Sequence, residues 1–282
     1  MKTKNIIALI VAFVLIALGG LIVGATLSSV DFDFSKLNSL TVVENTYTIK
    51  EDFTSISAKG IECDIRLSLS ENEECKVICR EYTKVAHKAA IADNTLTITR
   101  EDSRKWYDYI GVFIDKTEII VFLPKAEYEA LNIGGSTCDI DIPDDFKFKN
   151  VTFSNNTGDI YFASLVEENL SVTTNTGDIA ILNTKPKNIS IVSDTGDVEL
   201  KDTIASESIS ASTSTGDIEL YGCDGGKLFL SSDTGDISGT LLSGKTFKAE
   251  SDTGDITVPL STSGGVCEIK TDTGDIYIKA NK

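Results

Sequence analysis

The residues of this sequence whose type and spacing could bind a metal are aspartates that recur at a fixed interval. The motif Thr-Gly-Asp followed by Ile or Val occurs seven times. In four copies another aspartate stands three residues before the motif aspartate. Carboxylate oxygens repeated along one edge are ligands that Ca²⁺ prefers. The candidate calcium ligands are the paired aspartates Asp194, Asp197, Asp233, Asp236, Asp252, Asp255, Asp272 and Asp275.

Hydrogen bonding within the turns is the other role open to these carboxylates. Unit charges about 4.8 Å apart, the spacing of paired strands, repel by roughly 1 kcal/mol in water, and a hydrogen bond to a charged group contributes about 1.5 to 3 kcal/mol. The position three residues before the motif aspartate is not always acidic, since three repeats have Asn156, Asn175 or Ser214 there. The repeats also lack the doubled-glycine loop of calcium-binding nonapeptides. We therefore expect the aspartates to accept bonds from turn amides or threonine hydroxyls. We expect no cofactor, with calcium as the alternative.

Catalytic chemistry finds little support in the sequence. His87 is the only histidine, so a histidine metal site or a Ser-His-Asp triad would depend on one residue in an alternating segment, where a structural or solvent-facing role is expected. Carboxylate pairs carry no signal in a chain with 43 acidic residues, and the repeats have no matched column of basic residues. We expect no enzymatic activity. An enzyme acting on polysaccharide is the less favoured alternative.

A cluster of large aromatic residues is the candidate recognition site. Trp106, Tyr107 and Tyr109 interrupt the strand pattern and include the only tryptophan of the chain. Such side chains commonly dominate recognition energies because they bury a large apolar area and still offer a polar group. The alternative is that this segment packs over the side or the open end of the fold, where exposed strand edges need covering.

The spacing of the aspartates also predicts the elements that position them. Apolar residues stand eight and six positions before each motif aspartate, and one and usually three positions after it, which is the period of β-strands. Each repeat is therefore a strand, a tight Gly-Asp corner and a second strand, and successive coils should pair in parallel. The aspartates are Asp159, Asp178, Asp197, Asp217, Asp236, Asp255 and Asp275, with Asp139 extending the series backwards.

These intervals of 19 or 20 residues predict the fold class. A unit of this length can bury its apolar side chains only against a copy of itself. We predict an all-β protein, a single-stranded β-solenoid or β-helix of about 19–20 residues per coil, preceded by one transmembrane helix.

The amino-terminal segment predicts attachment to a membrane. Residues 6–27 carry no charge over a length that can cross a hydrocarbon core. Lys2 and Lys4 before this segment, with Asp31 and Asp33 after it, orient the amino terminus toward the cytoplasm. A cleaved signal peptide is the alternative, but the apolar stretch exceeds the usual central region of such peptides. We expect a single-pass protein of the cell membrane whose carboxyl-terminal domain is extracytoplasmic.

The chain is expected to divide at the ends of this helix and at the start of the regular repeats. In 53–130 the spacing drifts while the alternation persists, which predicts irregular first coils of the same solenoid. The expected parts are a cytoplasmic amino terminus at 1–5, a transmembrane helix at 6–27, a juxtamembrane tether at 28–52 and a solenoid at 53–282, with irregular coils at 53–130 and regular coils at 131–282.

Charge and small residues limit the expected partners. A net charge of −17 makes nucleic acid and an anionic membrane surface poor partners, because phosphate contacts need Lys and Arg. The protein meets the membrane through its helix. There Gly20 and Gly24 form a GxxxG pair that could seat a second helix and so form a homodimer.

The six cysteines do not form a recognisable disulfide framework. Cys267 stands in an inward column and is expected to be a buried free thiol. Cys63 and Cys138 both replace the corner glycine, so they could bridge if their coils stack directly. No partner can be assigned to the remaining three, Cys75, Cys79 and Cys223.

Several of these features together resemble a known family. An amino-terminal anchor precedes an irregular β region with Asn-Thr-Leu-Thr-Ile at 94–98 and an aliphatic strand before Pro124, and the Thr-Gly-Asp-Ile repeats follow. This arrangement is similar to the bacterial putative-adhesin β-solenoid family, a domain of unknown function, and above all to its membrane-anchored members, some encoded beside envelope-stress response systems. The resemblance covers about 53–282. It implies the fold, and the family pattern offers no catalytic residues.

The expected function follows from the anchor, the solenoid and this resemblance. We expect a membrane-anchored extracytoplasmic module that acts in adhesin-like binding or scaffolding at the bacterial cell envelope, with an envelope protein or glycopolymer as its partner. An accessory regulator of an envelope-stress response, acting through its membrane helix, is the alternative.

Overall fold

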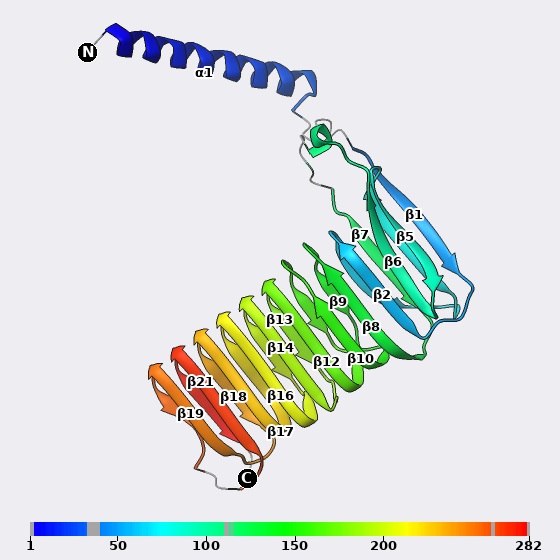
Figure 1. Ribbon diagram of the computed structural model, residues 1–282, viewed down its shortest axis with the longest axis vertical. Coiled ribbons are helices and arrows are strands. Elements are labelled where there is room, and N and C mark those ends of the chain that lie inside the picture. Colours follow the sequence, from blue (N-terminus) through cyan, green and yellow to red (C-terminus); the bar gives the residue numbers. More distant parts are fainter. Residues whose placement is uncertain (1–2, 33–39, 110–112, 114, 261–262, 281–282) are drawn as a thin grey trace.

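The computed structural model describes residues 3–32, 40–109, 113, 115–260 and 263–280. Its first element is the helix α1 (Thr3–Ser29), within which Leu9–Ser29 is long and apolar enough to cross a membrane. A Cβ added at Gly20 or Gly24 would meet no described atom within 4 Å, so this face is open. The pairing of two such helices stays a prediction. Apart from one short 3₁₀ turn, the rest of the described chain is all-β (Figure 1).

Two facing parallel sheets form the regular part of the protein (Figure 1). Each coil gives one strand to a long-strand sheet, turns a corner and gives one strand to a short-strand sheet. The long-strand sheet contains β8 (Glu127–Gly135), β10 (Lys147–Ser154), β12 (Leu165–Thr176), β14 (Asn188–Thr195), β16 (Ile204–Thr215), the later part of β17 (Ile218–Thr234), β19 (Thr246–Thr253) and β21 (Val266–Thr273). The short-strand sheet contains β9 (Ile140–Ile142), β11 (Ile160–Phe162), β13 (Ile179–Leu182), β15 (Val198–Lys201), the first part of β17, β18 (Ile237–Leu241), β20 (Ile256–Thr257) and β22 (Ile276–Ala280).

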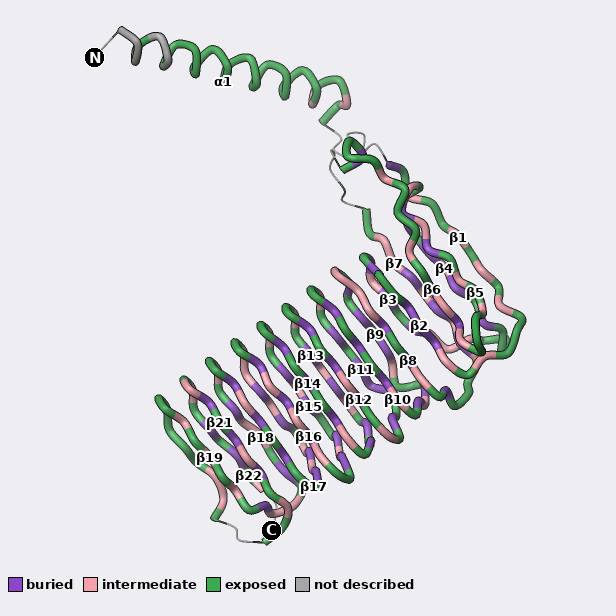
Figure 2. Tube along the Cα trace, viewed as in Figure 1, coloured by how far each residue is buried: buried purple, intermediate pink, exposed green. Residues whose placement is uncertain are grey.

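The core lies between the two sheets, and the predicted inward columns fill it. Leu170, Ile189 and Ile209 stand in register in the long-strand sheet and are buried. Val198 and Ile218 are likewise paired in register and buried in the short-strand sheet. Figure 2 shows the resulting alternation of buried and exposed positions along each strand. Each such side chain contributes about 1.5 to 3 kcal/mol of hydrophobic stabilisation, which a coil gains only when another coil covers it.

Glycine is required at the corner where the chain passes from one sheet to the other. Gly196 has a φ of 134°, and a Cβ on it would lie 2.2 Å from the carbonyl oxygen of Gly177 in the preceding coil. Gly177 stands over Gly158 with the same close approach. The corner therefore needs both a positive φ and the absence of a side chain.

A buried polar column that the sequence analysis did not single out lies beside the corner glycines. It occupies the position four residues before each motif aspartate. The hydroxyl of Thr213 donates to the carbonyl of Gly196 at 3.2 Å, and that of Ser232 donates to the carbonyl of Gly216 at 3.0 Å. The hydroxyls of Thr213 and Ser232 thus find a partner at the bend, whereas that of Ser193 in the same column has none among the described residues.

Two coils are exchanged in space relative to their order in the sequence. β21 pairs with both β17 and β19, and β22 pairs with both β18 and β20. The coil of β21 and β22 therefore lies between two other coils. The coil of β19 and β20 forms the distal end of the solenoid, the end farther from α1 (Figure 1). The prediction that each coil pairs with the next in sequence is wrong here. All coils present the same inward pattern, so this pattern does not determine their order.

The proximal end is closed by an antiparallel cap. The first coil, β2 (Ser55–Ile61) and β3 (Asp64–Leu69), lies between the coil of β8 and β9 and the coil of β6 (Thr95–Asp102) and β7 (Glu118–Leu123). Beyond these, β5 (Val85–Ala92) pairs antiparallel with β6, and β4 (Cys75–Tyr82) with β7. Next to β4 lies β1 (Val42–Ile49), also antiparallel. Residues 42–49, expected in the tether, are thus an edge strand whose Tyr47 and Ile49 pack on the core.

The described cysteines are all buried free thiols. Cys267 lies in the core, as expected. The coils of Cys63 and Cys138 do stack directly, since β3 pairs with β9, yet the two thiols form no disulfide. Burial raises the pKa of Cys138 and of Cys267 to about 12. The thiols therefore stay protonated and unreactive at neutral pH.

Candidate recognition site

The predicted aromatic cluster lies on a single 3₁₀ turn (Trp106–Tyr109) between β6 and β7. The side chains of Trp106, Tyr107 and Tyr109 are 77%, 46% and 56% exposed. The rings of Trp106 and Tyr107 meet edge to face with centroids 5.8 Å apart. The structure thus brings the three predicted residues together and presents them to solvent. Their role in recognition stays a prediction.

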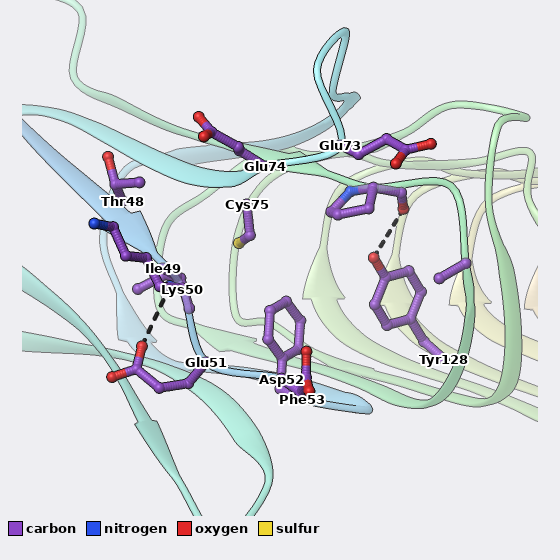
Figure 3. A pocket seen from close by; sticks show the side chains of 12 residues that line it. Thr48, Ile49, Lys50, Glu51, Asp52, Phe53, Glu73, Glu74, Cys75 and Tyr128 are labelled. Carbon is purple, nitrogen blue, oxygen red and sulfur yellow. Dashed lines mark hydrogen bonds between the residues drawn. The ribbon is translucent and has the colours of Figure 1, made fainter.

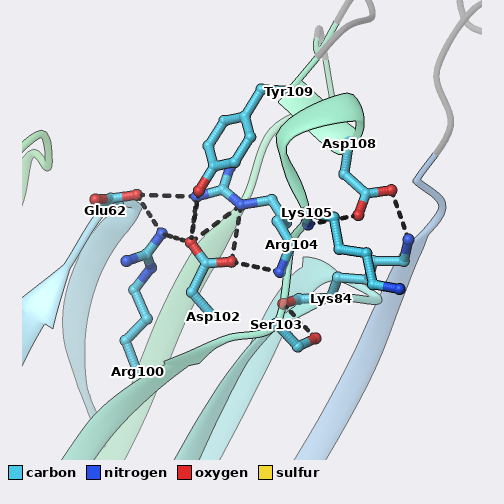
Figure 4. Close-up of polar contacts among 9 residues, drawn as sticks. All are labelled: Glu62, Lys84, Arg100, Asp102, Ser103, Arg104, Lys105, Asp108 and Tyr109. Carbon is cyan, nitrogen blue, oxygen red and sulfur yellow. Dashed lines mark hydrogen bonds and ion pairs between the residues drawn. The ribbon is translucent and has the colours of Figure 1, made fainter.

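A buried aspartate holds this turn in place. The side chain of Asp108 is 2% exposed, and its Oδ2 accepts the amide of Lys105 at 2.8 Å. Its Oδ1 lies 2.5 Å from Nζ of Lys84, which stands between β4 and β5 (Figure 4). The pKa of Asp108 is held below its usual range mainly by the hydrogen bond from Lys84, and also by the bond from the Lys105 amide. The turn is therefore fastened to the antiparallel cap.

An arginine–carboxylate cluster supports the ring of Tyr109 (Figure 4). Asp102, the last residue of β6, accepts Nη2 of Arg104 at 2.6 Å and Nη2 of Arg100 at 2.7 Å. The hydrogen bond from the Arg104 side chain holds the pKa of Asp102 well below its usual range. The Arg104 guanidinium lies 4.4 Å from the centroid of the Tyr109 ring, a cation–π contact. The ring of Tyr109 is thus supported by a guanidinium that Asp102 holds in place.

The aromatic turn lies at the end of the body where the chain enters from α1 (Figure 1). The amide of Thr83 donates to the carbonyl of Thr41 at 3.0 Å, and the amide of Ser103 donates to the carbonyl of Lys84 at 2.9 Å. The entry point, the β4–β5 turn and the aromatic turn are therefore neighbours. About a dozen positions separate the end of α1 from Thr41, and an extended chain of that length spans at most about 40 Å.

The motif aspartates form a hydrogen-bonded ladder along the corner edge. Oδ1 of Asp178 accepts the amide of Asp197 at 2.9 Å, and Oδ1 of Asp197 accepts the amide of Asp217 at 2.7 Å. This is the predicted bonding to turn amides, here from the next coil, and it includes Asp64 at the corner where Cys63 replaces the glycine. In spatial order the ladder contains Asp64, Asp139, Asp159, Asp178, Asp197, Asp217, Asp236, Asp275 and Asp255.

The second column of candidate calcium ligands lies just before the corner. Asp194, Asp233 and Asp252 are exposed, and Asp272 lies 3.1 Å from Nζ of Lys270. Among the residues that the structure describes, no three histidine, cysteine or acidic side chains are grouped so that they could hold a metal ion. Calcium binding stays an untested alternative.

A buried Glu81–His87 pair in the cap is a feature that the sequence analysis missed. Nδ1 of His87 lies 2.7 Å from Oε2 of Glu81, and the same oxygen accepts the His87 amide at 2.7 Å. Both side chains are 2% exposed. The alternation along β4, in which Cys75 and Cys79 also point inward, could have predicted Glu81 as buried. A carboxylate held by a main-chain amide and an imidazole is a structural contact within the cap.

A cavity of about 440 Å³ opens between the end of β1 and the start of β2 (Figure 3). Glu73 and Glu74 line it together with Cys75 and Tyr128. The Tyr128 hydroxyl donates to the carbonyl of Pro124 at 2.9 Å, and burial raises the pKa of Cys75 to about 12. Neither group is therefore an activated nucleophile, and Lys50 is the one basic residue among the acidic residues that line the hollow.

Comparison with known proteins identifies one family and, among solved structures, a similar fold with a TM-score above 0.5. The family model described as Toastrack DUF4097 matches residues 53–221 and 183–282. A crystal structure of a putative adhesin from Bacteroides fragilis has a TM-score of 0.52 at 17% identity, with 86% of this chain and 97% of that chain covered. A putative adhesin from Parabacteroides merdae has a TM-score of 0.40 at 15% identity, with 87% and 98% covered. No curated protein matches the sequence significantly.

Proposed function

The chain belongs to the Toastrack DUF4097 family, and from this membership we propose that it is a non-enzymatic, adhesin-like binding or scaffolding module of the bacterial cell envelope. In this proposal α1 anchors the protein in the membrane, and the solenoid stands outside the cytoplasm as a rigid body. The Bacteroides fragilis protein of similar fold is named a putative adhesin, which supports the same class of function. The proposed partner is an envelope protein or glycopolymer.

The observation that carries the proposal is the aromatic turn, which is held by the buried Asp108 and by the contacts of Asp102 with Arg104. A rigid, exposed group of large apolar side chains is typical of binding surfaces, because little conformational freedom is lost on contact. Asp108 and Asp102 fix the backbone of the turn, and Trp106 remains 77% exposed. The turn supplies the contact surface in this proposal.

An enzyme that acts on polysaccharide finds less support in the described residues. Such enzymes pair a carboxylic acid with a second carboxylate across a cleft that holds the sugar. The motif aspartates are instead engaged with the amides of neighbouring coils. His87, the only histidine, is buried against Glu81.

Site-specific crosslinking in intact cells tests the proposal. A photoreactive amino acid in place of Trp106 should capture a discrete envelope component, whereas the same group in place of Tyr161, which is 43% exposed on the short-strand sheet, should not. Equal capture at both positions, or none at either, would contradict the proposal. Capture only by a probe within α1 would favour the alternative of a regulator that acts through its membrane helix.

Substitution of the aromatic turn separates binding from stability. Replacing Trp106, Tyr107 and Tyr109 together by Ala should abolish binding of the captured component to the purified protein and leave the melting temperature nearly unchanged, because the rings are exposed. A variant that loses many degrees of stability would show that the turn packs onto the cap, and the binding surface would then have to be sought elsewhere.

A further inference from the structure

The distal coil ends the solenoid with an open strand edge. Within the described part of the chain, β19 pairs only with β21, and β20 pairs only with β22. In an inner coil the amide of Val198 donates to the carbonyl of Asp217 at 2.8 Å, but the equivalent amide of Ile256 donates to no described group. The carboxylate of Asp255 accepts no bond from the described residues, unlike the other members of the ladder. Among the described residues β19 therefore has a strand partner on one side only, and its outer side is open to pairing.

The apolar core is also open at this end. Phe247 and Ala249 occupy the inward columns of β19 but are only half-buried, whereas the same positions of inner coils are buried. In β20, Ile256 is 44% exposed. At about 25 cal/mol per Å² of apolar surface, covering this end with another strand would stabilise the assembly. An uncovered core end with free strand groups is a site for strand addition.

The charges on the outer face of β19 alternate with those of its neighbour. Lys248 stands opposite Glu268 of β21, and Glu250 stands opposite Lys270. Opposite charges directly across two strands are favourable, and like charges are unfavourable. Lys248 and Glu250 flank Ala249, so this edge is complementary to itself. A twofold axis through Ala249 would place Lys248 opposite Glu250 of a second chain, twice over.

We propose that β19 is the docking edge for a second copy of this chain, which pairs antiparallel with it about a twofold axis at Ala249. The two solenoids would join end to end, with each core closed by the other. The proximal end terminates in the antiparallel strands β1 and β5, whereas the twofold contact uses only the distal edge of each chain. The assembly therefore closes as a dimer and does not extend into a filament. This inference concerns the end of the rod opposite the aromatic turn and is independent of the function proposed above.

Charge reversal with rescue tests the dimer. The full chain in detergent should sediment as a dimer, and Lys248→Glu should weaken dimerisation about tenfold or more, because it creates two like-charge pairs. Adding Glu250→Lys to this variant should restore the dimer. A control reversal at another exposed lysine, Lys227→Glu, should have no effect. All three positions are exposed, so each variant should still fold, with only a small fall in melting temperature where a reversed charge faces Glu268 or Lys270 within the same chain.

Two results would overturn the proposal. One is a monomeric wild-type chain at all concentrations, which would leave the edge to a different partner. The other is a dimer that is insensitive to Lys248→Glu. If that dimer dissociates when Gly20 and Gly24 are both replaced by Leu, the chains associate through the membrane helix. The docking proposal instead expects the Gly20→Leu and Gly24→Leu variant to keep a dimer that Lys248→Glu weakens.

Discussion

The amide nitrogen of Asp275 lies 2.7 Å from Oδ1 of Asp236, which stands 39 residues earlier in the sequence. Asp255, between them in the sequence, lies on the far side and donates to Oδ1 of Asp275 at 2.7 Å. The aspartate ladder therefore follows the order of the coils in space. A corner carboxylate recognises the amide of whichever coil stacks next, and this gives the motif aspartate a structural role.

Substitution of a ladder aspartate should weaken the solenoid. Asp197→Ala removes the acceptor for the amide of Asp217 and should lower the free energy of unfolding by about 1 to 3 kcal/mol. Asp197→Asn keeps an oxygen at this position and should cost much less. Asp194→Ala is the matched control, because it removes an exposed carboxylate outside the ladder. Urea denaturation of the three variants measures these differences. Equal losses for Asp197→Ala and Asp194→Ala would show that the ladder bond contributes nothing.

Removal of calcium should leave the stability unchanged. If amides satisfy the aspartate column, the purified protein should melt at the same temperature in excess EDTA as in millimolar calcium. An ion that binds only the folded state would raise the melting temperature by mass action. A calcium-dependent rise that disappears in Asp233→Ala with Asp236→Ala would instead assign the paired aspartates as ligands.

The corner glycines should tolerate no side chain. Gly196→Ala should destabilise the protein by several kcal/mol, because the added Cβ would lie 2.2 Å from the Gly177 carbonyl and φ is 134°. Gly60→Ala is the control: φ is 68°, but a Cβ there would meet nothing within 4 Å. It should cost only the conformational strain, about 1 to 2 kcal/mol. Thermal unfolding compares the two, and a similar loss for both would contradict the close stacking of the corners.

Thiol labelling should separate the folded from the unfolded protein. In the native state at pH 8 the six cysteines should react very slowly with a thiol reagent, because burial raises the pKa of groups such as Cys75 and Cys79 to about 12. All six should react after denaturation without reductant. Reaction of only four would reveal a disulfide, for which Cys63 and Cys138 are the candidates, and Cys63→Ser would then identify it.

The repeat could be predicted from the sequence, and the ends of the solenoid could not. The inward positions of Leu170 and Ile189 follow from a period of two, and Asp197 follows from the need of a tight corner for an acceptor. The exchanged order of β19 and β21 leaves no trace in this pattern, since Phe247 and Cys267 are apolar residues in the same column. The sequence predicts drifting coils where the antiparallel cap lies, because the cap strands alternate as coil strands do.

For the aromatic turn, the residues were predictable and the framework was not. Trp106, Tyr107 and Tyr109 stand out because large aromatic residues interrupt a strand pattern. The bond between Asp108 and Lys84 joins residues 24 positions apart through a tertiary contact, so no local pattern indicates it. Whether a ring is exposed or covered depends on such contacts, which spacing alone does not specify.

The insertion of β21 between β17 and β19 has a consequence for the time course of folding. A chain that emerges from its amino terminus can add coils one after another as far as Leu241, since each new coil finds a finished surface. The segment Thr246–Thr253 then finds no native partner, because its partner, Val266–Thr273, has yet to be synthesised. The coil of β19 and β20 can therefore take its native place only after the coil of β21 and β22 has been synthesised. An early stop codon or a proteolytic cut between β20 and β21 would deprive the folded rod of two coils.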